Sequence, residues 1–282
     1  MEAAVKDIAN NNKFEATSNT TGESTVLSDL QKVDSSVTSS DNVSIVYQTY
    51  IDITVTDAEK DTDKFSELAV NLTPMYRVVA TKQDNVTSDA TLVTEGDGQN
   101  AVLIQEGKQL NNVPVKNYEV KLALPTDFAN AGDKLSIKHT KENGSIEYYT
   151  GTVTKEGTDP NTKTYVTFTT NGFSPFVIYA ASANVASIGE GENQKVYPTL
   201  QAAIDAVQNN ETITLLKDTN ENVTVSKPIK FTLAGGKDYL KGSIAAGSRY
   251  SMTTSETTSG NTEYTFTSVG GGSSSSISTP TT

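Results

Sequence analysis

Several residue types that carry chemistry are scarce or missing in this sequence. The 282 residues contain no cysteine and no tryptophan, and only one histidine. Without cysteine the chain has no disulfides, no thiolate nucleophile and no cysteine-ligated zinc site. It also lacks a run of about 18 apolar residues, so no transmembrane helix is predicted.

The N-terminal stretch MEAAVKDIANNN lacks the basic start and apolar centre of a secretory signal. Two interpretations stay open: a cytoplasmic protein, or an internal piece of a longer secreted chain. The formal net charge of −12 repels phosphate backbones and anionic lipid surfaces. We therefore expect neither a nucleic-acid partner nor membrane insertion.

Hydrophobic residues make up 35% of the chain and aromatic residues 7%. This composition favours thin cores between sheets over one large interior. In the stretch NVSIVYQTYIDITV, apolar residues fall on odd positions from Val43 to Val55, and polar residues fill most of the even ones. A period of two over this length predicts a long strand with one buried face.

Turn signals divide the next segment into short strands. An acidic turn is predicted over 57–64, and Pro74 is expected to interrupt the following strand. The dipeptides Asn143-Gly144 and Asn171-Gly172 each predict a tight hairpin. Closely spaced strands with no helix between them predict an antiparallel β-sandwich over 42–181.

A different pattern begins at residue 197. Pro198 suits the first turn of a helix, and Leu200, Ala203, Ile204 and Val207 have amphipathic helical spacing. Short strands about ten residues apart follow, separated by polar corners. We therefore predict a small β-helix-like unit over 197–269 with one short capping helix, which makes the overall fold class all-β.

Composition also predicts the connecting segments. Residues 1–41 are read as a linker or the remnant of a preceding domain, largely disordered. Residues 182–196 are read as an interdomain linker, and 270–282 as a flexible Gly/Ser/Thr-rich linker that leads to a further segment.

Candidate sites are few. Asp57, Glu59, Asp61 and Asp63 alternate along the chain and could offer several oxygens to calcium, although the stretch lacks the central glycine and final glutamate of an EF-hand loop. A solvated charge run is the competing interpretation. No cofactor motif and no catalytic residues are identified.

The remaining candidates for a catalytic or sugar-binding role are better explained as structural residues. His139, the single histidine, sits in a strand pattern where no partners for catalysis can be inferred. Tyr148 and Tyr149 are adjacent in a strand and therefore point to opposite faces, so they cannot form one sugar-binding platform, and one of them is expected in the core.

Three stretches carry a resemblance to a known class of protein. NLTPMYRVVAT (71–81), together with LALPTDFANAGDKLSIKH and VTFTTNGFSPFVIYA, resembles a domain of large modular surface proteins of Gram-positive bacteria. VYPTLQAAIDAVQNNETITLLKD resembles the β-helix-like unit that often follows it, and GGGSSSS resembles the linker before further repeats or S-layer-homology domains. The resemblance implies a location at the bacterial cell surface or cell wall, with no catalytic residues attached.

On these grounds we expect an extracellular structural or adhesive module that acts as a spacer or display domain without catalysis. Its partner would be a host or cell-wall glycan or protein. The alternative is an accessory or truncated region of a β-helix carbohydrate-active enzyme, such as a polysaccharide lyase or hydrolase. A β-helix enzyme builds its site along many stacked coils, and only two or three are predicted here.

Overall fold

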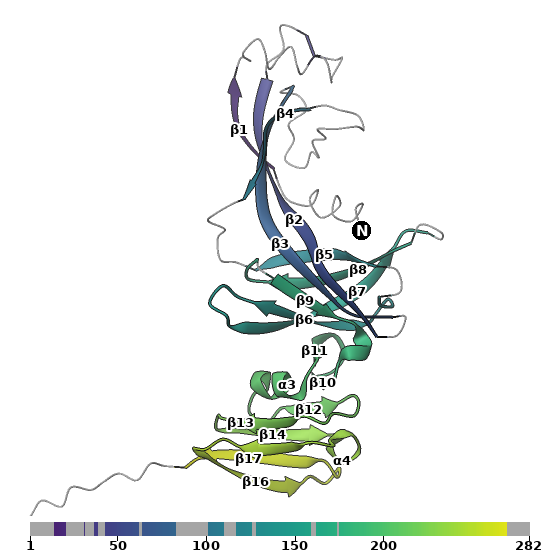
Figure 1. The fold of residues 1–282 in the computed structure, drawn as a ribbon, viewed down its shortest axis with the longest axis vertical. Helices are drawn as coiled ribbons and strands as arrows, with labels where there is room; N and C mark the ends of the chain where they lie inside the picture. Colours follow the sequence, from purple (N-terminus) through teal and green to yellow (C-terminus); the bar gives the residue numbers. More distant parts are fainter. Residues whose placement is uncertain are drawn as a thin grey trace, which may run out of the picture. The chain divides into compact units, whose positions relative to one another are not determined.

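The computed structural model describes residues 14–20, 31, 37–38, 43–61, 64–82, 101–109, 117–125, 128–158, 162–173 and 175–269. These residues are mostly β-strand (Figure 1), which confirms the all-β prediction at that level. The chain divides into two compact units. Unit 1 comprises 1–133, 138–147 and 151–178, and unit 2 comprises 134–137, 148–150 and 179–282.

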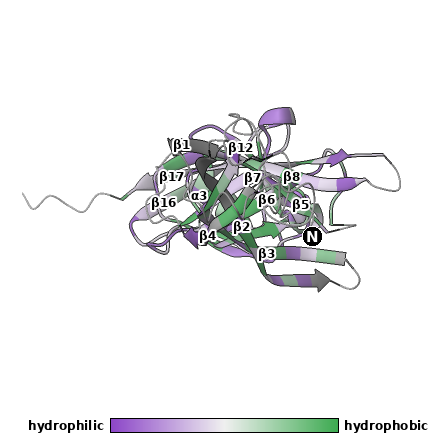
Figure 2. Ribbon diagram, turned by 90° about the horizontal axis from the view of Figure 1, so that it is seen from above, coloured by the Kyte–Doolittle hydropathy of each residue, from purple (hydrophilic) through white to green (hydrophobic). Residues whose placement is uncertain are grey.

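Nine strands form the sheet that dominates unit 1, in the order β1-β2-β3-β9-β6-β7-β8-β5, with β4 also pairing with β3. They are β1 (Phe14–Thr20), β2 (Val43–Asp61), β3 (Lys64–Lys82), β4 (Ala101–Gln109), β5 (Tyr118–Leu124), β6 (Lys134–Thr140), β7 (Ile146–Glu156), β8 (Lys163–Thr170) and β9 (Pro175–Tyr179). Because hydrogen bonds join all nine into one sheet, a sandwich of two separate sheets is not confirmed. Hydrophobic and hydrophilic residues intermix along the strands (Figure 2), as expected when one face of a strand is buried.

Strands β2 and β3 form one long antiparallel hairpin, which corrects two sequence predictions. Most of the predicted acidic turn over 57–64 is strand, because β2 continues to Asp61 and β3 starts at Lys64. The register of the β2–β3 pairing shifts at a bulge between Val55 and Asp57, and the pairing continues beyond it. Pro74 does not interrupt β3 but stands opposite Ile51 in the ladder; a strand tolerates proline where no ladder bond needs its nitrogen.

Two predicted linkers contain regular structure. Residues 14–20, inside the predicted linker 1–41, form β1 and pair with β2. The predicted linker 182–196 forms the 3-10 helices η2 (Ala181–Ala183) and η3 (Gly191–Asn193), and the strands β10 (Ala186–Ile188) and β11 (Lys195–Tyr197) start within it. Its apolar residues Val185, Ala186 and Ile188 are buried in the core of unit 2, so this segment is packed rather than a linker.

The two Asn-Gly dipeptides behave differently. Gly144 has a φ of 79° and closes the β6–β7 hairpin, where the Lys141 N–H donates to Ser145 O at 2.9 Å. This confirms the first tight turn, with only the glycine of the pair at positive φ. The second hairpin prediction is wrong, because Asn171-Gly172 joins β8 to β9, and β6 and β7 lie between these strands in the sheet.

Unit 2 contains a six-stranded sheet in the order β11-β10-β12-β14-β17-β16 and a two-stranded sheet of β13 and β15. The remaining elements are α3 (Leu200–Ala206), β12 (Thr212–Leu215), β13 (Asn222–Val225), β14 (Ile229–Ala234), α4 (Gly236–Tyr239), β15 (Ser243–Ala246), β16 (Tyr250–Glu256) and β17 (Thr262–Ser268). The short helix predicted in this segment is present as α3, whereas a β-helix unit is not confirmed.

The pairing in unit 2 repeats along the chain. Thr212 lies opposite Thr232 and Asn222 opposite Ser243, both in parallel ladders, so the chain returns to the same position after 20 or 21 residues. Antiparallel strands bound the β12–β14 ladder on both sides: β10 pairs with β12 and β17 pairs with β14. In Figure 1, α3 lies at one end of this strand stack and β16 at the other.

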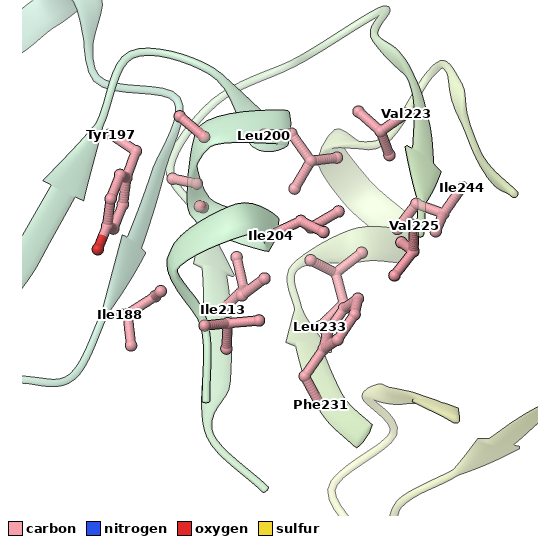
Figure 3. Close-up of a cluster of buried hydrophobic side chains, with 14 of the residues drawn as sticks. Ile188, Tyr197, Leu200, Ile204, Ile213, Val223, Val225, Phe231, Leu233 and Ile244 are labelled. Carbon is pink, nitrogen blue, oxygen red and sulfur yellow. The ribbon is translucent and has the colours of Figure 1, made fainter. Parts of the chain in front are cut away.

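One apolar core fills unit 2. The inward residues of β12, β13 and β14 alternate with exposed or partly exposed ones, as the sequence predicted. Figure 3 shows Leu200 and Ile204 of α3 pointing toward Val223, Val225 and Leu233. Each fully buried aliphatic side chain contributes about 1.5–3 kcal/mol relative to exposure, so α3 and the strands stabilise one another.

Candidate functional site

A network of polar contacts surrounds helix α3. At its first turn the Thr199 hydroxyl accepts a hydrogen bond from the Ala202 N–H at 3.1 Å. The Glu221 carboxylate accepts from the Leu200 N–H at 2.7 Å and from the Gln201 N–H at 3.1 Å. These bonds satisfy three amide groups that a helix start leaves without intrahelical partners, and they place a negative charge at the positive end of the helix dipole.

The other end of α3 is held by a cation. The Lys227 ammonium donates to Asp205 O at 2.8 Å and to Val207 O at 3.2 Å, both at the carbonyl end of the helix. Burial lowers the pKa of Lys227, and the nearby Asp205 carboxylate acts in the opposite direction. A lysine at this end complements the helix dipole.

The side chain of Gln201 joins the first turn of α3 to β13. Its side-chain oxygen accepts from the Thr224 N–H at 3.2 Å, and its side-chain nitrogen donates to Asp205 Oδ1 at 2.9 Å. We refer to Gln201, Glu221, Thr224 and Lys227 as the α3–β13 clamp. Since their polar groups already bond the helix to the next strand, the clamp is a structural device.

Sequence reasoning missed this clamp. Glu221 and Lys227 looked like ordinary members of the polar corners between strands. The available signal was their position: they follow Leu200 and Asp205 by about one coil of the chain, which brings them next to the helix ends.

Two tyrosines meet in unit 2: Tyr197 belongs to the buried core, and Tyr148 packs against that core. Tyr148 meets Tyr197 edge-on, with 6.2 Å between ring centroids and 67° between ring planes. Burial, and secondarily Glu211, raises the pKa of Tyr197 to about 12. Burial raises the pKa of Tyr148 as well, and Asp205 and Glu221 add to that shift. The edge-on geometry gives no flat shared surface of the kind that stacks on a sugar.

The expectation that either Tyr148 or Tyr149 is a core residue is met only in part. Both side chains are half-buried. Tyr148 packs against the unit-2 core cluster without being fully buried.

His139 is buried in unit 1, with 2% of its surface exposed. Its ring stacks on Phe176, with 4.4 Å between centroids and 8° between ring planes. Burial lowers its pKa, while Glu147 raises it and Lys141 lowers it further. A buried, uncharged imidazole flat against a phenyl ring has a packing role.

The acidic residues proposed for calcium are only partly described. Asp57 and Glu59 are exposed on β2; the side chain of Asp61, and the whole of Asp63, lie outside the described residues. Glu59 stands directly opposite Glu67 of β3. Burial raises the pKa of Glu67, and the charges of Glu59 and then Asp57 add to the increase.

Metal binding at that stretch stays a prediction. Within the part of the chain that the structure describes, no three His, Cys, Asp or Glu side chains gather in a way that could hold a metal ion. What the β2–β3 ladder does show is a pair of like charges facing each other, which is unfavourable in a sheet.

The fold defines a predominantly β protein of two units. Residues 39–153 match the model of a family described as an uncharacterized protein conserved in archaea (DUF2118). The match spans less than half of the chain, so it shows similarity over that segment. No curated protein and no solved structure matches the chain.

This match corrects the resemblance drawn from the sequence. The assignment to modular cell-wall or S-layer-type surface proteins of Gram-positive bacteria is wrong, because the family that matches is conserved in archaea. The quoted stretches are strand-and-turn patterns that unrelated β proteins can share. No helix among the described residues is long and apolar enough to cross a membrane.

Proposed function

We propose that the chain is a non-catalytic structural module of an extracellular protein, serving as a spacer or display element for a glycan or protein contact. In this proposal unit 1 acts as a curled, sandwich-type β module, and unit 2 acts as a short β-helix-like module with one capping helix. The observation that carries it is that antiparallel strands flank the β12–β14 parallel ladder of unit 2 on both sides.

Closure distinguishes a spacer from a piece of a solenoid enzyme. A truncated β-helix would leave a parallel edge open for the next coil, and such an edge invites pairing with other chains. Here β17 pairs with β14 antiparallel from Ile229 to Leu233, and β16 continues the hairpin outward. The β12–β14 ladder is therefore closed by this chain's own strands, which supports a spacer module over a fragment of a lyase or hydrolase; the β13–β15 ladder has no such flanking strand among the described residues.

The α3–β13 clamp supports the same conclusion. Its carboxylate and ammonium are engaged in hydrogen bonds to helix ends, so they act in stability rather than in acid–base chemistry. A capping helix fixed in this way protects the end of a stacked core from solvent.

The proposal is tested by surface accessibility. An antibody raised against residues 128–269 is applied to intact and to lysed source cells, with an antibody to a ribosomal protein as the control for leakage. Labelling of intact cells without the ribosomal signal supports the extracellular module. Labelling only after lysis contradicts it, and the chain would then be assayed for intracellular roles.

A further inference from the structure

The chain contains two Asn-Gly dipeptides, at 143–144 and 171–172, and this pair of residues has its own covalent chemistry. The glycine nitrogen can attack the side-chain amide carbon of the preceding asparagine, because glycine has no side chain to obstruct the approach. The two sites have the same dipeptide in different surroundings, so the structure itself provides the comparison.

Asn143 lies at the exposed tip of the β6–β7 hairpin. Its Oδ1 accepts two hydrogen bonds from Ser145, from the backbone N–H at 2.9 Å and from the hydroxyl at 2.7 Å. These bonds fold the side chain over the following backbone and draw electron density from the amide carbon. The Gly144 N–H donates to Lys141 O at 2.9 Å, and this one bond must open before the nitrogen can attack. A Cβ built on Gly144 would meet nothing within 4 Å, so the exposed tip has room for that rearrangement.

Asn171 is held differently. It and its neighbours Gly172 and Phe173 are half-buried. The Thr170 hydroxyl donates to Gly172 O at 3.0 Å, Phe173 packs on Tyr118 with 4.8 Å between centroids, and a Cβ on Gly172 would lie 3.5 Å from the His139 ring. Rearrangement here requires these contacts to open.

We propose that Asn143 is a modification site at which the folded protein deamidates spontaneously, with Ser145 as a positioning residue, while Asn171 is protected. The Gly144 nitrogen loses its proton and forms a bond to Asn143 Cγ, and the Cγ–Nδ2 bond breaks with release of ammonia. Water then opens the resulting succinimide at either carbonyl. The products are aspartate or isoaspartate, and no oxidation or reduction occurs.

The modification would change both the charge and the geometry of the hairpin. A new carboxylate appears next to Glu142 and near the ion pair of Lys141 with Glu147. Isoaspartate also lengthens the backbone by one carbon within the turn closed by the Lys141–Ser145 hydrogen bond. The inference does not depend on the proposed function, since it needs only water and the folded chain.

The test is peptide mapping by mass spectrometry after incubation at mildly alkaline pH, on the folded protein and in urea. In the folded protein we expect conversion at residue 143 to be about tenfold or more faster than at 171, because local contacts must open at the second site. In urea the two rates should become similar. Equal rates in the folded protein, or the same ratio in urea, would overturn the proposal.

Two variants test the part assigned to Ser145. Ser145→Ala removes the hydroxyl donor to Oδ1 and should slow conversion at residue 143 several-fold in the folded protein but not in urea, whereas Ser145→Thr should restore it. An unchanged folded-state rate in Ser145→Ala would overturn the role given to Ser145. Asn143→Gln, with matching circular dichroism, should abolish the isoaspartate signal from this peptide.

Discussion

The two units use the same alternation of apolar and polar residues but connect their strands differently. In unit 1, β2 and β3 run antiparallel through a hairpin, and turn glycines such as Gly132 and Gly144 have open space around them. In unit 2, strands stack in parallel after 20 or 21 residues, and a Cβ on Gly242 would lie 1.8 Å from Glu221 O. Connectivity therefore decides how strictly a corner is constrained.

The physical reason is the spacing of adjacent strands. Parallel neighbours lie about 4.8 Å apart, so the corner of one coil runs against the backbone of the previous one. Hairpin turns of an antiparallel sheet project beyond the ladder and meet solvent. Core mutations should therefore destabilise unit 1 and unit 2 by similar amounts. Mutations of corner glycines should destabilise unit 2 more than unit 1.

The largest loss of stability is expected when a large buried side chain is removed from either core. Phe231 in unit 2 and Phe176 in unit 1 are both fully buried, and each contacts other aromatic rings. Phe231→Ala and Phe176→Ala should each lower the free energy of unfolding by about 3–5 kcal/mol. Hydrogen exchange in urea, followed by mass spectrometry on peptides of the affected unit, measures this.

The control for these core variants is Met252→Ala on β16, which should cost less than about 1 kcal/mol because Met252 is 37% exposed. A small loss in only one of the two Phe variants would break the claim that both cores are equally close-packed.

Substitution of a corner glycine should cost more stability in unit 2 than in unit 1. Gly242→Ala should cost about 3 kcal/mol, because the nearest atoms to the new Cβ belong to the backbone of Asn220 and Glu221 and cannot rotate away. Gly144→Ala should cost about 1 kcal/mol, since only its φ of 79° opposes a side chain. Thermal melts of both variants give the ranking, and equal losses would refute the comparison.

Sequence patterns predicted the features that depend on a single strand or a single helix. They located β2 and the short strands β12 to β14, and helical spacing located α3, because side-chain direction follows directly from backbone geometry. The first Asn-Gly turn was found for a similar local reason.

What the sequence did not reveal depends on contacts between distant residues. Alternation marks a buried face but not the neighbouring strand, so the insertion of β9 between β3 and β6 was missed. The clamp was missed because Glu221 and Lys227 gain their roles only when the next coil meets α3. β1 lies in a polar segment whose pairing with β2 leaves no periodic signal.

Removing the carboxylate of the clamp tests how far α3 depends on the coil below it. Glu221→Gln keeps one acceptor oxygen but removes the charge, and should cost about 1–2 kcal/mol. Exposed Glu256, paired with Lys237, provides the control, since Glu256→Gln should leave the melting temperature unchanged. Exchange of the Leu200 and Gln201 amides should accelerate only in the first variant.

Unit 1 should show a pH dependence that unit 2 lacks, because His139 is the single histidine. Its pKa in the folded state is below the ordinary value of 6.5, so below that pH the unfolded chain binds the proton more readily. Stability is therefore full above pH 6.5 and falls as the pH drops toward the folded-state pKa, by at most about 1.4 kcal/mol per pH unit. His139→Gln should remove this slope from urea denaturation curves recorded between pH 5 and 7.

The smallest effect concerns the acidic end of the β2–β3 hairpin. The pKa of Glu67 is raised in the folded state by burial and by the facing charges, so ionisation opposes folding and stability falls as the pH rises through that pKa. Glu67→Gln should therefore stabilise the protein at pH 7 by about 0.5 kcal/mol, an effect that salt reduces.

A calcium titration distinguishes two explanations of the acidic stretch at the end of the β2–β3 hairpin, a repulsive charge run or a metal site. If the acidic stretch is only a repulsive charge run, calcium and magnesium at equal ionic strength should raise the melting temperature equally. A calcium-specific increase that is lost in Asp57→Asn would instead establish the metal site predicted from Asp57, Glu59, Asp61 and Asp63. In that case the end of the antiparallel hairpin would need a ligand to offset its charge, whereas the coil of unit 2 offsets the charge of Glu221 with the amides of its own helix.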